Sequence, residues 1–172
     1  EEAGAGDQIP DFAPDLFAPG LPGSFTHFYT TMSFGQLQVE GTALPRRYTS
    51  DRPARTYLSK VADQRGRYDW FAEEVLRQVD AEVDLGQFDN DGPDGLPNSG
   101  DDDGVVDYVF VVVRQTPRNF ILGGATGIVG LNLEVDYQAA DTSASGSPLR
   151  ISGSRAHGAL LGEGTFAQTV GT

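Results

Sequence analysis

Residues 84–113 read DLGQFDNDGPDGLPNSGDDDGVVDYVFVVV. The part up to Asp107 is rich in Asp and contains no Lys or Arg, whereas the part that follows is dense in Val and aromatic residues. Carboxylates crowded just before a buried strand repel one another unless a cation lies among them. The stretch therefore predicts a cation-binding loop, followed by a strand over residues 105–113 that is covered on both faces and central in a sheet.

The spacing of the side chains in this loop predicts calcium as the cation. Calcium takes about six to eight oxygen ligands, and alternate Asp side chains converge on it where Gly permits a tight turn. Two partial copies of such a D-x-D-x-D-G pattern are present, but they do not form an EF-hand, because no Glu occupies the twelfth position and a strand follows. A solvated acidic loop is the alternative. The predicted metal ligands are Asp89, Asp91 and Asp94 from the first copy and Asp101, Asp103 and Asp107 from the second.

The composition limits the kinds of partner and compartment. The 172 residues carry a formal net charge of -13, which argues against a nucleic-acid partner. No apolar run reaches the roughly 20 residues that cross a bilayer. There is no Cys, and the chain begins at Glu1 without a signal peptide, so a secretion signal is expected to have been removed or to lie outside the sequence. Because free calcium is plentiful outside cells, the loop predicts a secreted, extracellular protein.

Apolar residues at helical spacing organise the rest of the chain. One compact domain is predicted over residues 23–172, after an extended Gly- and Pro-rich arm at residues 1–22. Ser24 is the predicted N-cap of a first helix, and Asp69 is the predicted cap of the longest one. The predicted helices cover residues 25–34, 56–62 and 69–79.

Alternation of apolar and polar residues predicts two half-buried strands. They cover residues 36–40 and 131–137, and the second is placed at the edge of a sheet. Residues 139–154 are polar and are interpreted as a loop, and no strand is assigned to the Gly-rich tail at residues 156–172.

Three segments together resemble the first half of the catalytic domain of secreted zinc metallopeptidases of the immune inhibitor A type. They are TTMSFGQLQVEGTAL at residues 30–44, the helix around Trp70, and the Asp loop with its Val-rich strand at residues 83–113. The resemblance implies an α/β, zincin-like subdomain with a mostly parallel twisted sheet, two or three helices and a calcium-binding loop. It also implies hydrolysis of peptide bonds in a peptide or protein substrate, with residues 131–137 as a strand able to pair with that substrate.

The residues that would hold zinc in such a peptidase are missing from this chain. Those enzymes carry H-E-x-x-H on a helix, and the two histidines here, His27 and His157, cannot form it. The tail GTFAQTVGT at residues 164–172 resembles the lead-in to the motif in either of two registers. In one, Gln168, Thr169 and Thr172 replace the two His and the Glu; in the other, the motif lies beyond Thr172. No catalytic residue is therefore assigned, and zinc is expected only if a longer protein supplies the motif.

Two functional hypotheses from different classes follow. The first is a part of a calcium-binding, secreted metallopeptidase. The second is a non-catalytic extracellular structural or binding module that self-associates through a strand edge. A further expectation concerns Glu73 and Glu74, which precede Arg77 at helical spacing and are interpreted as a solvated, ion-paired helix face.

Overall fold

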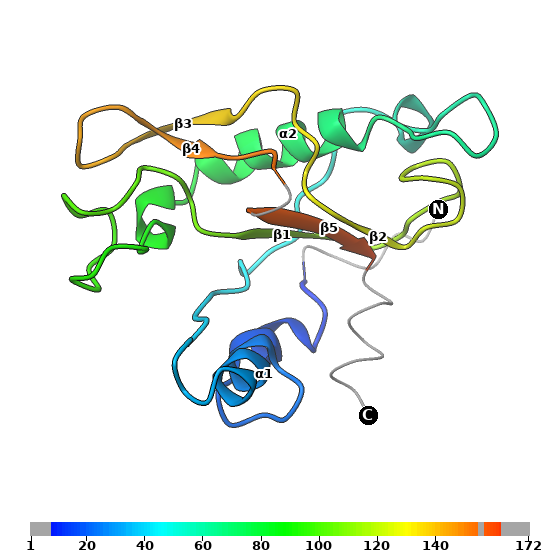
Figure 1. Ribbon diagram of the computed structural model, residues 1–172. Coiled ribbons are helices and arrows are strands. Elements are labelled where there is room, and N and C mark those ends of the chain that lie inside the picture. The colour runs from blue at the N-terminus through cyan, green and yellow to red at the C-terminus, as the bar shows by residue number, and fades with distance from the viewer. Residues whose placement is uncertain (1–7, 155–156, 163–172) are drawn as a thin grey trace. The chain divides into compact units, whose positions relative to one another are not determined.

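The computed structural model describes residues 8–154 and 157–162. Contacts divide the chain into two compact units, with the boundary between Tyr48 and Thr49. The first unit holds one α-helix, and the second holds the other α-helix and all the strands (Figure 1). Within the described residues the fold is mixed α/β, with two α-helices and a small mixed sheet. The predicted boundary between an arm at residues 1–22 and a domain from residue 23 stays a prediction.

The first unit is organised by hydroxyl side chains that form hydrogen bonds with the backbone. Helix α1 (Phe25–Met32) begins as predicted at Ser24, whose hydroxyl accepts a hydrogen bond from the His27 amide at 3.1 Å. The Thr26 hydroxyl donates to the carbonyl of Val39 at 2.5 Å, and the carbonyl of Phe17, at the end of the short 3₁₀ helix η1 (Ala13–Phe17), lies 3.1 Å away as a second acceptor for the same proton. The strand predicted at residues 36–40 is wrong, because the Thr26 side chain of α1 bonds to this backbone, which pairs with no strand of the described residues.

Helix α2 (Tyr68–Asp80) confirms the strongest helical pattern of the sequence. Its buried face consists mainly of apolar side chains one turn apart, which is the spacing that covers a core. Asp69 lies in the first turn beside Arg67 rather than at the cap, and Trp70 is exposed with the Arg67 guanidinium 3.4 Å from its ring centroid. The buried apolar residues are Tyr68, Ala72, Leu76 and Val79.

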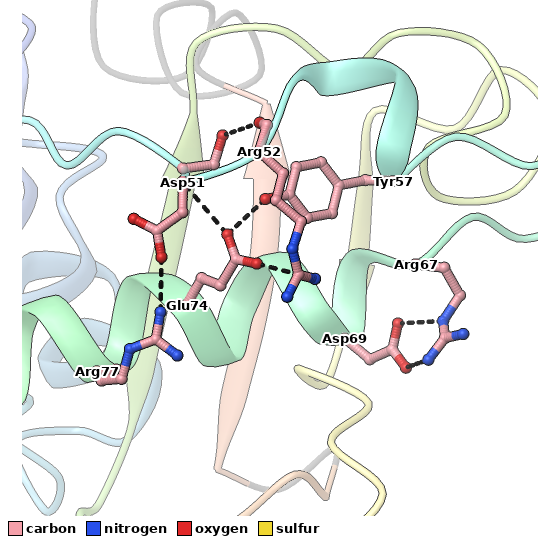
Figure 2. A network of polar contacts seen from close by, with 8 residues as sticks. Asp51, Arg52, Tyr57, Arg67, Asp69, Glu74 and Arg77 are labelled. Carbon is pink, nitrogen blue, oxygen red and sulfur yellow. Dashed lines mark hydrogen bonds and ion pairs between the residues drawn. The ribbon is translucent and has the colours of Figure 1, made fainter.

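Glu74 is buried on α2 and fastens the preceding loop to the helix. Figure 2 shows its carboxylate pointing toward Arg52 and Tyr57. It accepts a hydrogen bond from the Tyr57 hydroxyl at 2.5 Å and forms an ion pair with Arg52 at 3.2 Å. Arg77 pairs instead with Asp51, at 2.6 Å. The expectation of a solvated Glu74 paired with Arg77 is therefore wrong, because the partners come from a loop distant in sequence.

The sheet has the order β1-β5-β2. Strand β1 (Val109–Val113) pairs parallel with β5 (Gly158–Gly162), and β2 (Gly127–Val129) pairs antiparallel with the other edge of β5. The sheet is mixed, so the expectation of a mostly parallel sheet is wrong for the described residues. The predicted strand at residues 105–113 exists only from Val109 and lies at an edge, because β5, from the Gly-rich tail, takes the central place.

A separate hairpin occupies the segment that was interpreted as a loop. Strands β3 (Tyr137–Thr142) and β4 (Pro148–Ile151) pair antiparallel, and Leu149 and Ile151 are fully buried on either side of the exposed Arg150. Asp80 at the end of α2 anchors β3, since its carboxylate accepts hydrogen bonds from the Tyr137 hydroxyl at 2.8 Å and from the Ala140 amide at 3.0 Å. Burial beside this carboxylate raises the pKa of Tyr137.

Two further predicted elements are wrong. Residues 131–136 are not a strand, because Asn132 adopts a left-handed backbone with φ of 55° and Val135 is exposed, so the extended alternation is broken. An edge strand that pairs with substrate at residues 131–137 is therefore also lost. Residues 56–62 form no α-helix, because their backbone pairs with distant segments, as in the bond from the Ser59 amide to the Asn119 carbonyl at 2.8 Å. Only the short 3₁₀ helix η2 (Ala54–Thr56) is present there.

None of the helices in the described part of the chain is both long enough and apolar enough to span a membrane.

Candidate metal centre

The acidic loop is folded back on itself by backbone hydrogen bonds that bring its two ends together. It starts with a short 3₁₀ helix, η3 (Leu85–Phe88), capped by the Asp84 carboxylate, which accepts from the Gly86 amide at 3.0 Å. The Asp107 amide then donates to the Phe88 carbonyl at 2.8 Å, so residues 88 and 107 are adjacent although 19 positions apart in the chain. This bond places the Asp89 and Asp107 side chains in the same region.

Asp89, Asp91 and Asp107 form a three-carboxylate cluster. One carboxylate oxygen of each lies within 4.8 Å of the others, which is a suitable arrangement for holding a metal ion. Asp91 and Asp107 are exposed on the outer side of this cluster, whereas Asp89 has 0 % of its surface exposed. The cluster is therefore open to solvent on one side and closed on the other.

The buried carboxylate of Asp89 has no hydrogen-bond partner at either oxygen among the described residues. A buried polar group without a partner is rare in folded proteins and costs free energy, and an ionised one costs more. Burial, followed by the charges of Asp102 and Asp103, raises the pKa of Asp89 to about 6. Burial also raises the pKa of Asp107, opposed by a hydrogen bond from the Asn90 amide. A cation between these oxygens would satisfy both the missing contacts and the charge.

The other three predicted ligands have different partners in the loop. The Asp94 carboxylate accepts from the Leu96 amide at 2.7 Å, and the Asp103 carboxylate accepts from the Val105 amide at 2.8 Å. Asp101 accepts hydrogen bonds from the Asp94 amide at 3.1 Å and from the Ser99 hydroxyl, and the latter bond lowers its pKa. The structure thus groups two ligands of the first predicted copy with one of the second, rather than forming two separate sites.

Asp102 is a contributor that the sequence pattern missed. Its carboxylate accepts from the Gly92 amide at 2.7 Å and from the Ser99 amide at 2.6 Å, which ties the two halves of the loop together. A Cβ atom at Gly92 would lie 2.6 Å from an Asp102 carboxylate oxygen, so any other residue there would displace this carboxylate. The D-x-D-x-D-G pattern takes every second residue, so it includes Asp101 and Asp103 and omits Asp102. The run of three Asp residues at positions 101–103 was the sequence feature that could have indicated a role for Asp102.

The chemistry of the cluster favours a hard cation. The three side chains offer only carboxylate oxygens, and such ligands suit calcium, magnesium or manganese better than zinc, which prefers imidazole and thiolate. Neither histidine contributes to this group, since His27 belongs to α1 and His157 precedes β5. The residues proposed to align with the zinc motif, 164–172, lie outside the described residues. The cluster is therefore suited to a divalent ion bound by carboxylate oxygens.

The unusual pKa of Asp89 leads to a prediction about pH in calcium-free buffer. In the fold Asp89 holds its proton up to about pH 6, against an ordinary value of 3.8 in the unfolded chain. A raised acid pKa means that the folded state binds more protons, so wild type loses stability as pH rises between these two values. The stability of Asp89→Asn minus that of wild type should therefore grow across this window and stay constant above it. Urea denaturation below, within and above the window measures the difference, and a difference that is flat with pH would contradict the prediction.

Comparisons with protein-family models, with curated proteins and with solved structures give no match to this chain.

Proposed function

We propose that the chain is a calcium-binding domain in which Asp89, Asp91 and Asp107 hold the ion. The observation that supports this most directly is the Asp89 carboxylate, which is buried, has both oxygens without a hydrogen-bond partner among the described residues, and faces two further carboxylates. An apo protein has to bear the cost of this arrangement, and a cation removes it. Calcium is favoured over magnesium because a cluster open on one side accepts a larger, more variable oxygen shell.

The ion would act as a structural clip on a long loop. Between Asp89 and Gly104 the acidic loop carries one large apolar side chain besides its prolines, the exposed Leu96, and its Asp side chains repel one another without a counterion. Holding Asp89, Asp91 and Asp107 on one ion would fix the two ends of the loop against each other. A site of three carboxylates, two of them exposed, fits the calcium concentrations found outside cells, so the proposal includes a secreted protein.

The direct test is thermal unfolding with and without calcium. At a free calcium concentration about 100-fold above the dissociation constant, binding to the folded state alone should add ~2.7 kcal/mol of stability. For a chain of this size that raises the midpoint by roughly 5–10 °C. Magnesium at the same ionic strength should give a smaller rise. A midpoint that is the same in calcium and in chelator would refute the proposal.

The wider proposal places this clip in a zincin-like domain of a secreted metallopeptidase. It is supported by the resemblance of residues 30–44 and 83–113, and by the parallel pairing of the Val-rich strand β1 with β5. Peptide-bond hydrolysis is assigned only to a longer protein that supplies H-E-x-x-H beyond Thr172, because no such motif is present in this sequence. Translating the gene past that position is the test, since a stop codon at Thr172 leaves a non-catalytic module.

A further inference from the structure

Asn98 contacts both the metal cluster and the β3–β4 hairpin. Its backbone amide donates to the carbonyl of Asp89 at 2.7 Å. Its side chain donates to the Thr142 carbonyl at 3.0 Å and accepts from the Ala144 amide at 2.7 Å, so both ends of the amide group are used at the turn of the hairpin. The residue has a positive φ of 51°, a conformation that Asn tolerates better than most residues. Asn98 therefore joins the backbone of the buried Asp89, through its own backbone, to a segment more than 40 positions away, through its side chain.

Other hydrogen bonds attach the rest of the loop to the same hairpin. The Leu85 amide, at the start of the loop, donates to the Asp141 carboxylate of β3 at 2.7 Å. At the end of the loop, the backbone amide of Arg150 in β4 donates to the Gly104 carbonyl at 3.0 Å, and the Arg150 carbonyl accepts from the Val106 amide at 2.9 Å. The loop is thus bonded to the hairpin at its beginning, near its middle and at its end, and only the middle contact also bonds to Asp89.

We propose that Asn98 is a positioning residue that couples cation binding at Asp89 to closure of the β3–β4 hairpin. This inference rests on the proposed calcium site. An ion that fixes Asp89 also fixes the Asn98 backbone, which orients the Asn98 amide toward Thr142 and Ala144. Coupling of this kind is reciprocal: the ion stabilises the hairpin, and the closed hairpin raises the affinity for the ion.

The test compares calcium binding and hydrogen exchange in variants of the intact chain. Asn98→Gly keeps the left-handed backbone and removes the amide group. Asn132→Gly is the matched control, since Asn132 also has a positive φ of 55° and uses its side chain in a hydrogen bond, here with Arg65 at 2.8 Å. Ala144→Pro removes the hairpin donor of the same contact without altering the loop, and it keeps the test usable if Asn98→Gly fails to fold.

We expect Asn98→Gly and Ala144→Pro to weaken calcium affinity by roughly three- to tenfold, and Asn132→Gly to leave it unchanged. In wild type, calcium should slow amide exchange both in the loop, at Gly92 and Asp103, and in the hairpin turn, at Ser143 and Gly146, whose amides donate to the carbonyls of Ser147 and Ser143. In Asn98→Gly the loop amides should still respond and the hairpin amides should not. A residue with a merely structural role would lower stability equally with and without calcium and would not separate the two sets of amides.

Two results would overturn the inference in different ways. If wild type binds calcium but Asn98→Gly and Ala144→Pro bind it equally well, with the same slowing of exchange in the hairpin, the coupling is absent and the calcium site stands. If wild type itself shows neither binding nor a change in exchange with calcium, the proposed function fails and the coupling fails with it.

Discussion

Asp89→Asn is expected to abolish the stabilisation by calcium and, in calcium-free buffer near neutral pH, to make the protein more stable than wild type by roughly 1–3 kcal/mol. The two effects have opposite signs because they share one cause. The Asp89 carboxylate is buried with no hydrogen-bond partner among the described residues. It therefore lowers the stability of the fold when no ion is bound and raises it when an ion is bound. Asn is nearly isosteric and neutral, and its NH₂ group can donate to the carboxylates of Asp91 and Asp107.

The matched control is Asp94→Asn, which removes the same charge from the same loop outside the three-carboxylate cluster. Calcium affinity should fall by more than about 100-fold in Asp89→Asn and only a few-fold in Asp94→Asn, as calorimetric titration would measure. If the two variants lose affinity equally, the ligand set is wider than Asp89, Asp91 and Asp107. If Asp89→Asn is less stable than wild type in chelator, the buried carboxylate stabilises the fold without an ion, which contradicts the prediction.

Sequence reasoning succeeded where the signal is local. Ser24 followed by apolar residues at helical spacing predicted α1, and the longer pattern after Asp69 predicted α2. Both depend on contacts within a few positions, which a sequence displays directly. The Asp loop ahead of a Val-rich strand was likewise predicted, because charge crowding and strand composition are local properties.

The strands that were missed owe their existence to distant partners. Strand β5 has the sequence GALLG, and its two glycines are not typical of a strand. Gly158 is needed because Leu131 and the Val109 carbonyl approach it too closely for a side chain. The β3–β4 hairpin is polar on one side, and the buried Leu149 and Ile151 are its only strong apolar signal. Conversely, residues 36–40 alternate between apolar and polar side chains but have no partner strand among the described residues, so they do not form a strand.

The composition of the metal cluster depends on the same kind of long-range contact. Asp spacing alone groups Asp89 with Asp91 and Asp94, because these are near in sequence. The bond from the Asp107 amide to the Phe88 carbonyl instead brings Asp107 to Asp89, while Asp94 turns to a neighbouring backbone amide. The sequence could predict that carboxylates gather in this loop, but which three of the six candidate ligands lie together depends on the fold of the loop.

Glu74→Ala is expected to lower the free energy of unfolding by about 2–4 kcal/mol. The Glu74 side chain is only 6 % exposed and binds three groups of one loop: the Tyr57 hydroxyl, the Asp51 amide at 3.2 Å and the Arg52 guanidinium (Figure 2). Removing the carboxylate leaves the buried Tyr57 hydroxyl without this acceptor. The Arg52 side chain is half exposed, so water can solvate its guanidinium once Glu74 is gone, and the loss of stability stays below that for a fully buried ion pair. Urea denaturation measures the change.

Glu73→Ala is the control that separates burial from charge, because Glu73 is the exposed neighbour on the same helix. Its effect should stay within about 0.5 kcal/mol, as for most surface positions. Glu74→Gln should fall between the two, since its amide oxygen still accepts from Tyr57 while the ion pair with Arg52 is lost. Equal stabilities for Glu73→Ala and Glu74→Ala would mean that the loop is held by other contacts. In every one of these variants the calcium response should persist, because none of the altered groups belongs to the three-carboxylate cluster.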